Sequence, residues 1–81
     1  MKKIKIAFMA GLKESVPDPS INMDLDGSIA DTKALQDHLL ETYSGLRKKA
    51  FKMAVNEEVV QDSIELKDGD EVVLLPPFSG G

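Results

Sequence analysis

The chain has 81 residues, enough for one domain and near the lower size at which a hydrophobic core is stable without cross-links. Hydrophobic residues make up 42% of it, so we expect the chain as a whole to fold. It contains no cysteine, which excludes disulfides, thiolate metal sites and cysteine nucleophiles. The net charge of −4 argues against nucleic acid as the main partner, because phosphate binding requires a basic surface.

The amino-terminal segment begins like a signal peptide but lacks the apolar stretch of one, because Lys5 interrupts the run. No part of the sequence approaches the ~20 apolar residues of a membrane helix. A small domain without cysteine also fits a reducing compartment. We therefore expect a cytoplasmic protein that uses neither a membrane nor a nucleic acid as its partner.

Alternating apolar residues predict a first strand over about residues 3–10 and a second strand that ends at Gly27. Residues 11–19 lie between them and contain two prolines and a glycine, so they are expected to form a loop. The apolar side chains of one face are Ile4, Ile6 and Phe8 in the first strand and Ile21, Met23 and Leu25 in the second.

One helix is predicted to follow. Ser28 precedes Asp31 by three positions, which has the form of an N-terminal capping box. The helix is expected to end near residues 44–45, because glycine is a favoured helix terminator. Its apolar face repeats at spacings of three or four and comprises Ile29, Thr32, Leu35, Leu39 and Tyr43.

The second half of the chain predicts three more strands, at residues 51–55, 58–60 and 71–75, with turns at residues 56–57 and 67–70. Strands on both sides of one helix indicate an α+β domain, in which the helix packs on one face of a single mixed sheet. Leu35 and Leu39 are then expected to pack against the first and last strands.

The last strand is followed directly by the end of the chain, which reads Pro76-Pro77-Phe78-Ser79-Gly80-Gly81. Two prolines restrict the backbone, whereas two glycines can pass through a channel too narrow for side chains. The reactive group at such an end is the α-carboxylate of Gly81, so we interpret this carboxylate as the functional site. The alternative is that residues 76–81 are an end without function.

Three segments of the sequence carry a resemblance to a known family. They are Ala54-Val55-Asn56, Leu66-Lys67-Asp68-Gly69-Asp70-Glu71-Val72 and the carboxy-terminal Pro76-Pro77-Phe78-Ser79-Gly80-Gly81. Together they resemble the MoaD-type sulfur carriers, the small subunits of molybdopterin synthase in the ubiquitin-like MoaD/ThiS family. The resemblance implies a single β-grasp domain over residues 1–81 with a tail at about residues 76–81. Glu57 stands where the family often has glycine, so a non-glycine residue with positive φ is expected in that turn.

The resemblance also implies the chemistry and the partners. An E1-like adenylating enzyme would use ATP and magnesium to activate the Gly81 carboxylate, and a persulfide sulfur donor would convert it to a thiocarboxylate. The thiocarboxylate would enter a large synthase subunit of the MoaE type and give its sulfur to a pterin precursor. No catalytic residue, metal or stably bound cofactor is then expected on this chain.

Strand alternation predicts a docking surface. If Ile4, Ile6 and Phe8 face the helix, then Met9 faces away from it. If Val72 and Leu74 face inward, then Leu75 faces outward, and Val59 and Val60 split between the two faces. Met9, Val59 and Leu75 are then apolar residues on a solvent face. An apolar group beside the tail suggests a protein interface, and these positions align with residues that the family uses for its large subunit. Single exposed apolar residues are common, however, and have no meaning individually.

Other candidate sites have simpler explanations. His38 is a lone histidine beside two carboxylates and is expected on the helix surface rather than at a metal. Residues 24–27 are similar to the start of a calcium loop but lack its later ligands, so turn chemistry is predicted. The basic residues Arg47, Lys48, Lys49 and Lys52 are expected in a solvated connection, with contact to an acidic partner or phosphate as the alternative.

Two other functional classes remain open. A thiamine-type sulfur carrier shares the chemistry but is usually shorter and commonly lacks the two prolines before the tail. A ubiquitin-like modifier would form isopeptide bonds to lysines, and a β-grasp interaction domain would use no covalent chemistry. The molybdenum pathway and a related tungsten pathway are not distinguished by the sequence.

Overall fold

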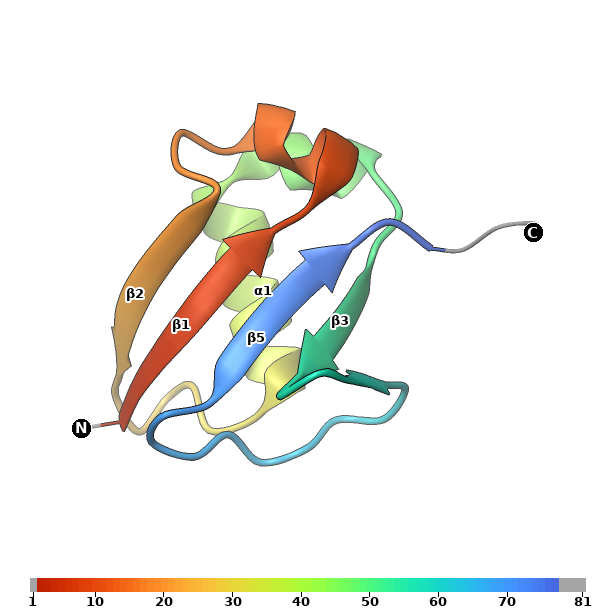
Figure 1. Ribbon diagram of the computed structural model, residues 1–81. Coiled ribbons are helices and arrows are strands. Elements are labelled where there is room, and N and C mark those ends of the chain that lie inside the picture. Colours follow the sequence, from red (N-terminus) through yellow and green to blue (C-terminus); the bar gives the residue numbers. More distant parts are fainter. Residues whose placement is uncertain (1, 78–81) are drawn as a thin grey trace.

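The computed structural model describes residues 2–77, so the predictions for Phe78, Ser79, Gly80 and Gly81 lie outside the described residues. Strands, helix and strands follow one another in the predicted order (Figure 1). The elements are β1 (Lys2–Phe8), the 3₁₀ helix η1 (Ala10–Ser15), β2 (Ser20–Leu25), α1 (Thr32–Thr42), the 3₁₀ helix η2 (Ser44–Lys48), β3 (Lys52–Val55), β4 (Glu58–Val60) and β5 (Glu71–Leu75).

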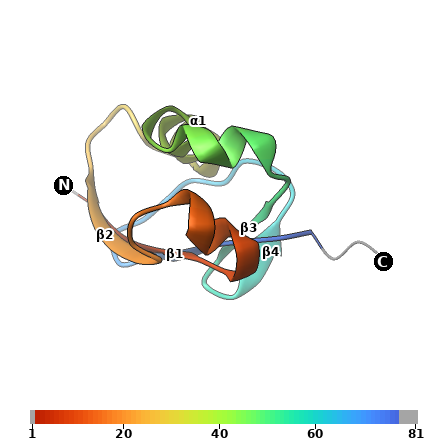
Figure 2. The ribbon, with the colours of Figure 1, turned by 90° about the horizontal axis from the view of Figure 1, so that it is seen from above.

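The strands form one mixed sheet in the order β2-β1-β5-β3-β4. The central pair, β1 and β5, is parallel, and every other neighbouring pair is antiparallel. Figure 2 shows α1 as a separate layer on one face of the sheet. The predicted α+β architecture is therefore confirmed. No helix in residues 2–77 is long and apolar enough to cross a membrane.

The core lies between α1 and the sheet. Leu35 and Leu39 of α1 are fully buried, as predicted, together with the inward residues of the first and last strands. The connections also supply core residues that the strand and helix patterns did not indicate. These are Leu12 in η1, Val16 after it, Leu46 in η2 and Leu66 before β5.

Two predicted boundaries are wrong at the start of the chain. The first strand ends at Phe8 rather than near residue 10, because Ala10 adopts a positive φ of 52° and turns the chain out of the sheet. The expected loop at 11–19 contains most of η1, whose Leu12 side chain packs into the core. A single buried leucine gives too short a pattern to predict a helix.

The predicted helix start is also wrong. Asp31, not Ser28, is the N-cap of α1, and its side chain accepts a hydrogen bond from Ala34 N at 2.8 Å. Ser28 belongs to the preceding turn, where its backbone N–H and hydroxyl both donate to the Asp26 carboxylate. The turn predicted for residues 24–27 therefore lies at residues 26–28, whereas Asp24 and Leu25 belong to β2. The helix ends at Thr42, two residues before the predicted end.

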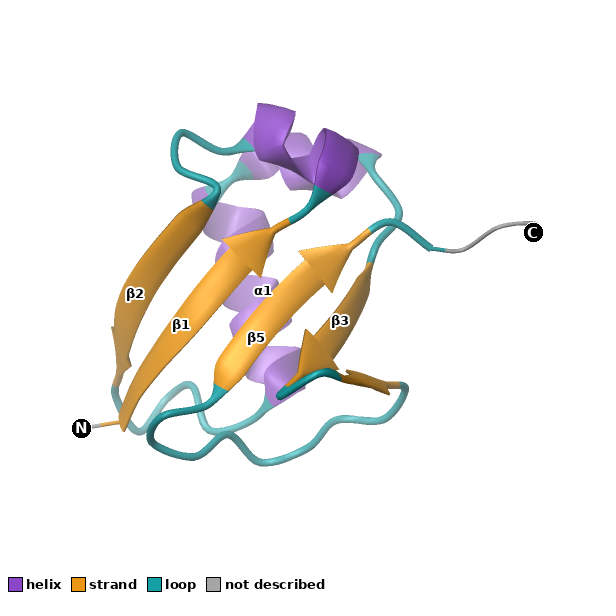
Figure 3. Cartoon of the chain, in the orientation of Figure 1, coloured by secondary structure: helices purple, strands orange, loops and turns teal. Residues whose placement is uncertain are grey.

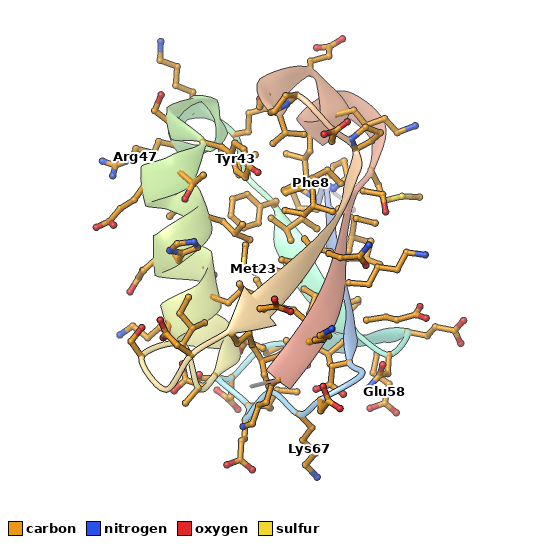
Figure 4. The ribbon with its side chains drawn as sticks, turned by 90° about the vertical axis from the view of Figure 1, so that its left-hand side faces the viewer. Phe8, Met23, Tyr43, Arg47, Glu58 and Lys67 are labelled. Carbon is orange, nitrogen blue, oxygen red and sulfur yellow. The ribbon has the colours of Figure 1, made fainter. Side chains whose placement is uncertain are left out.

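The basic cluster after α1 lies only partly in a connection: Arg47 and Lys48 belong to η2, Lys49 follows it, and Lys52 begins β3. Its members have different structural roles. Arg47 Nε donates to Leu40 O at 3.1 Å, which satisfies a carbonyl near the end of α1. Lys49 Nζ donates to Gly11 O at 3.0 Å and joins η2 to η1. Figure 4 shows Arg47 toward the same end of the molecule as Tyr43. The Tyr43 and Phe8 rings meet edge to face, with their centroids 5.8 Å apart.

The turn at Asn56 and Glu57 has positive φ at both residues, 51° and 72°, as expected for this hairpin. Asn56 Nδ2 donates to Asp70 Oδ1 at 2.9 Å, and Asn56 Oδ1 accepts from Glu71 N at 3.0 Å. The second Asp70 oxygen accepts from Lys67 N at 2.8 Å. Two of the three segments that carry the family resemblance therefore form one hydrogen-bonded unit, which we call the Asn56–Asp70 clamp.

Candidate functional site

The tail leaves the domain from the end of the central strand. β5 lies between β1 and β3, and its last ladder pair joins Leu75 to Lys52. Pro76 and Pro77 follow, and neither has a backbone N–H to continue the ladder. The ladder of β5 therefore ends at Leu75. Figure 3 shows that η1 and η2 lie at this same end of the molecule.

An apolar row crosses the sheet face that α1 does not cover. Ala7 pairs with Val73, Val73 with Ala54, and Ala54 with Val59, so the four residues are direct neighbours on β1, β5, β3 and β4. Because side chains alternate along a strand, Ala7 and Val73 point to the face of the sheet away from the buried Phe8 and Val72. Since side chains in directly opposed pairs lie on one face, the row is a continuous apolar strip.

The structure places two predicted interface residues beside this strip and one within it. Met9 continues the alternation of β1 with an extended backbone (φ −107°, ψ 154°) and is 47% exposed. Val59 ends the strip and is 46% exposed, whereas Val60 turns inward and packs against the core. Leu75 is half-buried at the end of β5. Met9 and β5 are adjacent, because Met9 N donates to Leu74 O at 2.9 Å.

We call Met9, Val59 and Leu75, together with the strip of Ala7, Val73 and Ala54, the apolar face. It is rimmed by charge, since Lys52 lies opposite Leu75, and Lys5 lies opposite Glu71. An apolar centre with a polar rim is the usual composition of a protein-docking surface. Strand alternation predicted the three outer residues, but the pairing of the strands was needed to show that the surface is continuous.

Among the titratable groups of residues 2–77, one carboxylate has a clearly shifted pKa. The Ser28 hydroxyl and backbone N–H bond to Asp26 and hold the pKa of that carboxyl below its ordinary value. Within residues 2–77, no group of three or more histidine, aspartate or glutamate side chains is arranged to hold a metal ion. His38 is half-buried on α1 and lines a shallow depression with Asp26, Asp37 and Glu41.

The ThiS family model matches residues 7–81 of this chain. The chain belongs to the ThiS family. A curated relative from Chlamydomonas reinhardtii, named molybdopterin synthase sulfur carrier subunit, is 35% identical over 83 aligned positions. That alignment covers 98% of this chain and 99% of the relative. The predicted family resemblance is therefore confirmed.

Solved structures confirm the fold of this ThiS-family chain. A putative molybdopterin converting factor subunit 1 from Pyrococcus furiosus is similar with a TM-score of 0.83 at 21% identity, covering 95% of this chain and 99% of that one. A complex of subunits 1 and 2 of molybdopterin-converting factor from Helicobacter pylori contains a chain with a TM-score of 0.70 at 24% identity, with coverage of 98% and 99%. At these identities the likeness shows the β-grasp fold alone.

Proposed function

We propose that this ThiS-family protein is the sulfur carrier subunit of molybdopterin synthase, with the Gly81 carboxylate as its sulfur-carrying group. The observation that carries the proposal is the full-length similarity to a relative named as that subunit. The fold supports it, because β5 ends at Pro76 and Pro77 beside an apolar face in which Met9 and Val59 are exposed.

The carboxylate must first be activated, since its negative charge makes the carbonyl carbon a poor electrophile. A partner adenylating enzyme would use ATP and magnesium, so that a carboxylate oxygen attacks the α-phosphate and pyrophosphate leaves. The terminal sulfur of a persulfide donor then attacks the acyl-adenylate and expels AMP. A thiol reduces the resulting acyl disulfide and leaves a thiocarboxylate at Gly81.

Sulfur delivery takes place on a second partner. The thiocarboxylate would enter the large synthase subunit, where its sulfur passes to a pterin precursor and water restores the carboxylate. Two loaded carriers would supply the two sulfurs of the dithiolene. The carrier itself contributes position, because binding holds the sulfur at a high effective concentration next to the precursor. The groups that donate and accept protons would belong to the partner enzymes.

The apolar face is the surface we assign to the large subunit. It adjoins the root of the tail through Met9 and Leu75, so docking there would aim residues 76–81 into the partner. Pro76 and Pro77 lower the conformational entropy that the tail loses on insertion. ATP and magnesium would bind the adenylating enzyme rather than this chain, and both partners would meet the carrier in the cytoplasm.

Mass spectrometry of the intact protein tests the proposal. The protein is incubated with ATP, magnesium, an E1-like enzyme of proven activity and a persulfide donor, and the shift from replacing one oxygen by sulfur is measured. Fragmentation must assign the shift to Gly81, because oxidation of any of the four methionines adds nearly the same mass. An unmodified Gly81 would refute the carrier function for that enzyme.

The same preparation separates the competing functions. Stable co-purification with a large synthase subunit supports the molybdopterin pathway, whereas transfer of sulfur only to a thiazole-forming enzyme would assign the protein to thiamine synthesis. Isopeptide conjugates between Gly81 and lysines of other proteins would identify a modifier. Full activity of a protein with an amidated Gly81 would leave only a non-covalent interaction domain.

A further inference from the structure

Lysines gather at the end of the molecule from which the tail leaves. Four of the ten basic residues fall within positions 47–52, and Lys13 lies in η1, which Lys49 joins to η2 through Gly11 O. η1 follows β1 directly, and the parallel pairing of β1 with β5 brings η1 next to the end of β5. Lys52 lies opposite Leu75 at the last ladder pair before the tail.

We call Lys13, Lys48 and Lys52 the basic collar, and all three side chains are exposed. η1 and η2, which carry Lys13 and Lys48, are held together by Lys49, whose Nζ donates to Gly11 O at 3.0 Å. Lys49 also makes the single ion pair found within residues 2–77, with Glu14 at 3.8 Å. The collar lysines thus have no carboxylate within ion-pair distance in the described part of the chain, while the connection beneath them is held in place.

The opposite end of the molecule carries more carboxylates than lysines, although Lys2 and Lys3 also lie there: Lys2 Nζ donates to Leu66 O at 2.7 Å and Lys3 O accepts from Gly69 N. Residues 57–71 contain seven of the fourteen acidic residues and one of the ten basic ones, Lys67. Figure 4 shows Glu58 and Lys67 at the end away from Arg47. A seven-residue strand such as β1 spans about 23 Å, and charges in physiological salt are screened over about 8 Å. The acidic end therefore does not cancel the collar for a partner that approaches the tail.

The position of the basic collar suits a role in binding the partner enzyme rather than in the reaction of the carboxylate. Six residues from Pro76 to Gly81 span at most about 20 Å, so an inserted tail places its carboxylate far beyond the reach of the collar. The collar lysines therefore cannot stabilise the reacting carboxylate. When the tail is inserted into a partner enzyme, the domain around the root of the tail contacts the entrance of the partner's channel. The collar lysines lie in this region.

We propose that the basic collar docks on an acidic rim around the tail channel of the adenylating enzyme, an inference that rests on the proposed function. Two partners must use one tail in turn. The apolar face fits the stable synthase subunit, because apolar burial gives long-lived interfaces. A transient partner needs rapid association and release, and complementary charge raises the association rate more than it raises the affinity. The charge polarity also orients the carrier with its tail toward a negative partner.

Steady-state adenylation kinetics test the collar. Pyrophosphate release is measured against carrier concentration at saturating ATP, magnesium and persulfide donor, so that the acyl-adenylate is consumed in each cycle, in about 0.05 M and about 0.5 M salt. The collar variant is Lys13→Glu/Lys48→Glu. The matched control is Lys33→Glu/Lys67→Glu, which makes the same charge change at two exposed lysines away from the tail. Far-UV circular dichroism and thermal unfolding establish that both variants fold.

We expect the collar variant to raise the KM for the carrier about tenfold or more in low salt and less than about twofold in high salt. Its kcat should stay within about twofold, because the carboxylate is remote from the collar. A KM equal to that of the control variant would overturn the proposal. So would a salt-independent loss, a fall in kcat alone, or an equal weakening of binding to the large subunit in calorimetry.

Failure of this inference is distinguishable from failure of the proposed function. If wild-type Gly81 becomes a thiocarboxylate but both variants behave alike, the carrier function stands and the collar does not. If wild-type Gly81 remains unmodified by an active enzyme, the proposed function itself fails.

Discussion

Truncating the exposed part of the apolar face should weaken binding to the large subunit without unfolding the carrier. The variant is Met9→Ala/Val59→Ala, which removes the two most exposed large apolar side chains in the described part of the chain. Neither side chain belongs to the buried core. The free energy of unfolding should therefore change by less than about 0.5 kcal/mol for each substitution, as is usual for surface positions.

The expected loss of binding free energy follows from the exposed fractions of the two side chains. Full burial of such a side chain contributes about 1.5–3 kcal/mol. Met9 is 47% exposed and Val59 is 46% exposed, so docking can still bury about half of each. Each truncation then costs about 1 kcal/mol of binding free energy, and the pair costs about 2 kcal/mol. This corresponds to a dissociation constant that is higher by about 30-fold.

Isothermal titration calorimetry against the large subunit measures this change. Ile64→Ala is the matched control, because Ile64 is 39% exposed in the connection after β4 and lies near the start of α1, where its carbonyl accepts from Thr32 N. The control should leave the dissociation constant within about twofold. An affinity of the double variant equal to that of wild type, or an equal loss in the Ile64 variant, would refute the assignment of the apolar face.

Three further predictions concern the end of β5 and the clamp. Leu75→Glu should keep the fold, because Lys52 lies opposite, but should weaken association with the large subunit; unchanged affinity in calorimetry would contradict this. One extra residue after Gly81 should leave thermal stability unchanged and abolish sulfur transfer, and a fully active extended protein would show that the terminus does not react. Asn56→Ala should destabilise the protein by about 2 kcal/mol, because it removes two exposed hydrogen bonds and puts alanine at a left-handed backbone position. This loss of stability should lower Tm by about 8–16 °C. A Tm within 2–3 °C of wild type, by circular dichroism, would argue against a stabilising clamp.

A pH prediction follows from the turn before α1, in which Ser28 lowers the pKa of Asp26. A depressed folded-state pKa stabilises the protein above the ordinary pKa of aspartate, and this contribution disappears as pH falls through the folded pKa. Ser28→Ala should therefore raise the Asp26 pKa toward 3.8, as measured by NMR titration, and reduce the stability difference between neutral and acidic pH.

The sheet was predictable because β1, β2 and β5 alternate between more buried and more exposed residues, whereas β3 and β4 are short and do not. Both strands of the β3–β4 hairpin and the last strand were placed within a residue, since a positive-φ turn and an Asp-Gly turn separate them. The helix cap was not predictable from spacing alone. Ser28 and Asp31 both fit the pattern of an N-cap, and the tertiary bridge between Asp31 and Glu65 sets the chain direction there.

The candidate site was predictable only in part. Alternation indicated which side chains point away from α1, so Met9, Val59 and Leu75 could be named from local sequence. Their continuity depends on strand order, because Val59 reaches Val73 only through Ala54 on the intervening strand. Parallel pairing of the first and last strands is a contact between distant parts of the sequence, and local patterns do not specify it.

The clamp precedes β5 in the chain, whereas Gly81, the residue proposed to carry sulfur, follows it. Asn56 and Asp70 join the hairpin turn to the start of β5, while Gly81 follows its end. The clamp fixes where β5 begins, and the register of β5 with β1 and β3 then fixes where Leu75 and the two prolines emerge beside the apolar face. A shift of one residue would move Leu75 to the buried face and re-aim the tail. Under the proposed function, the clamp therefore affects sulfur transfer through the register of β5.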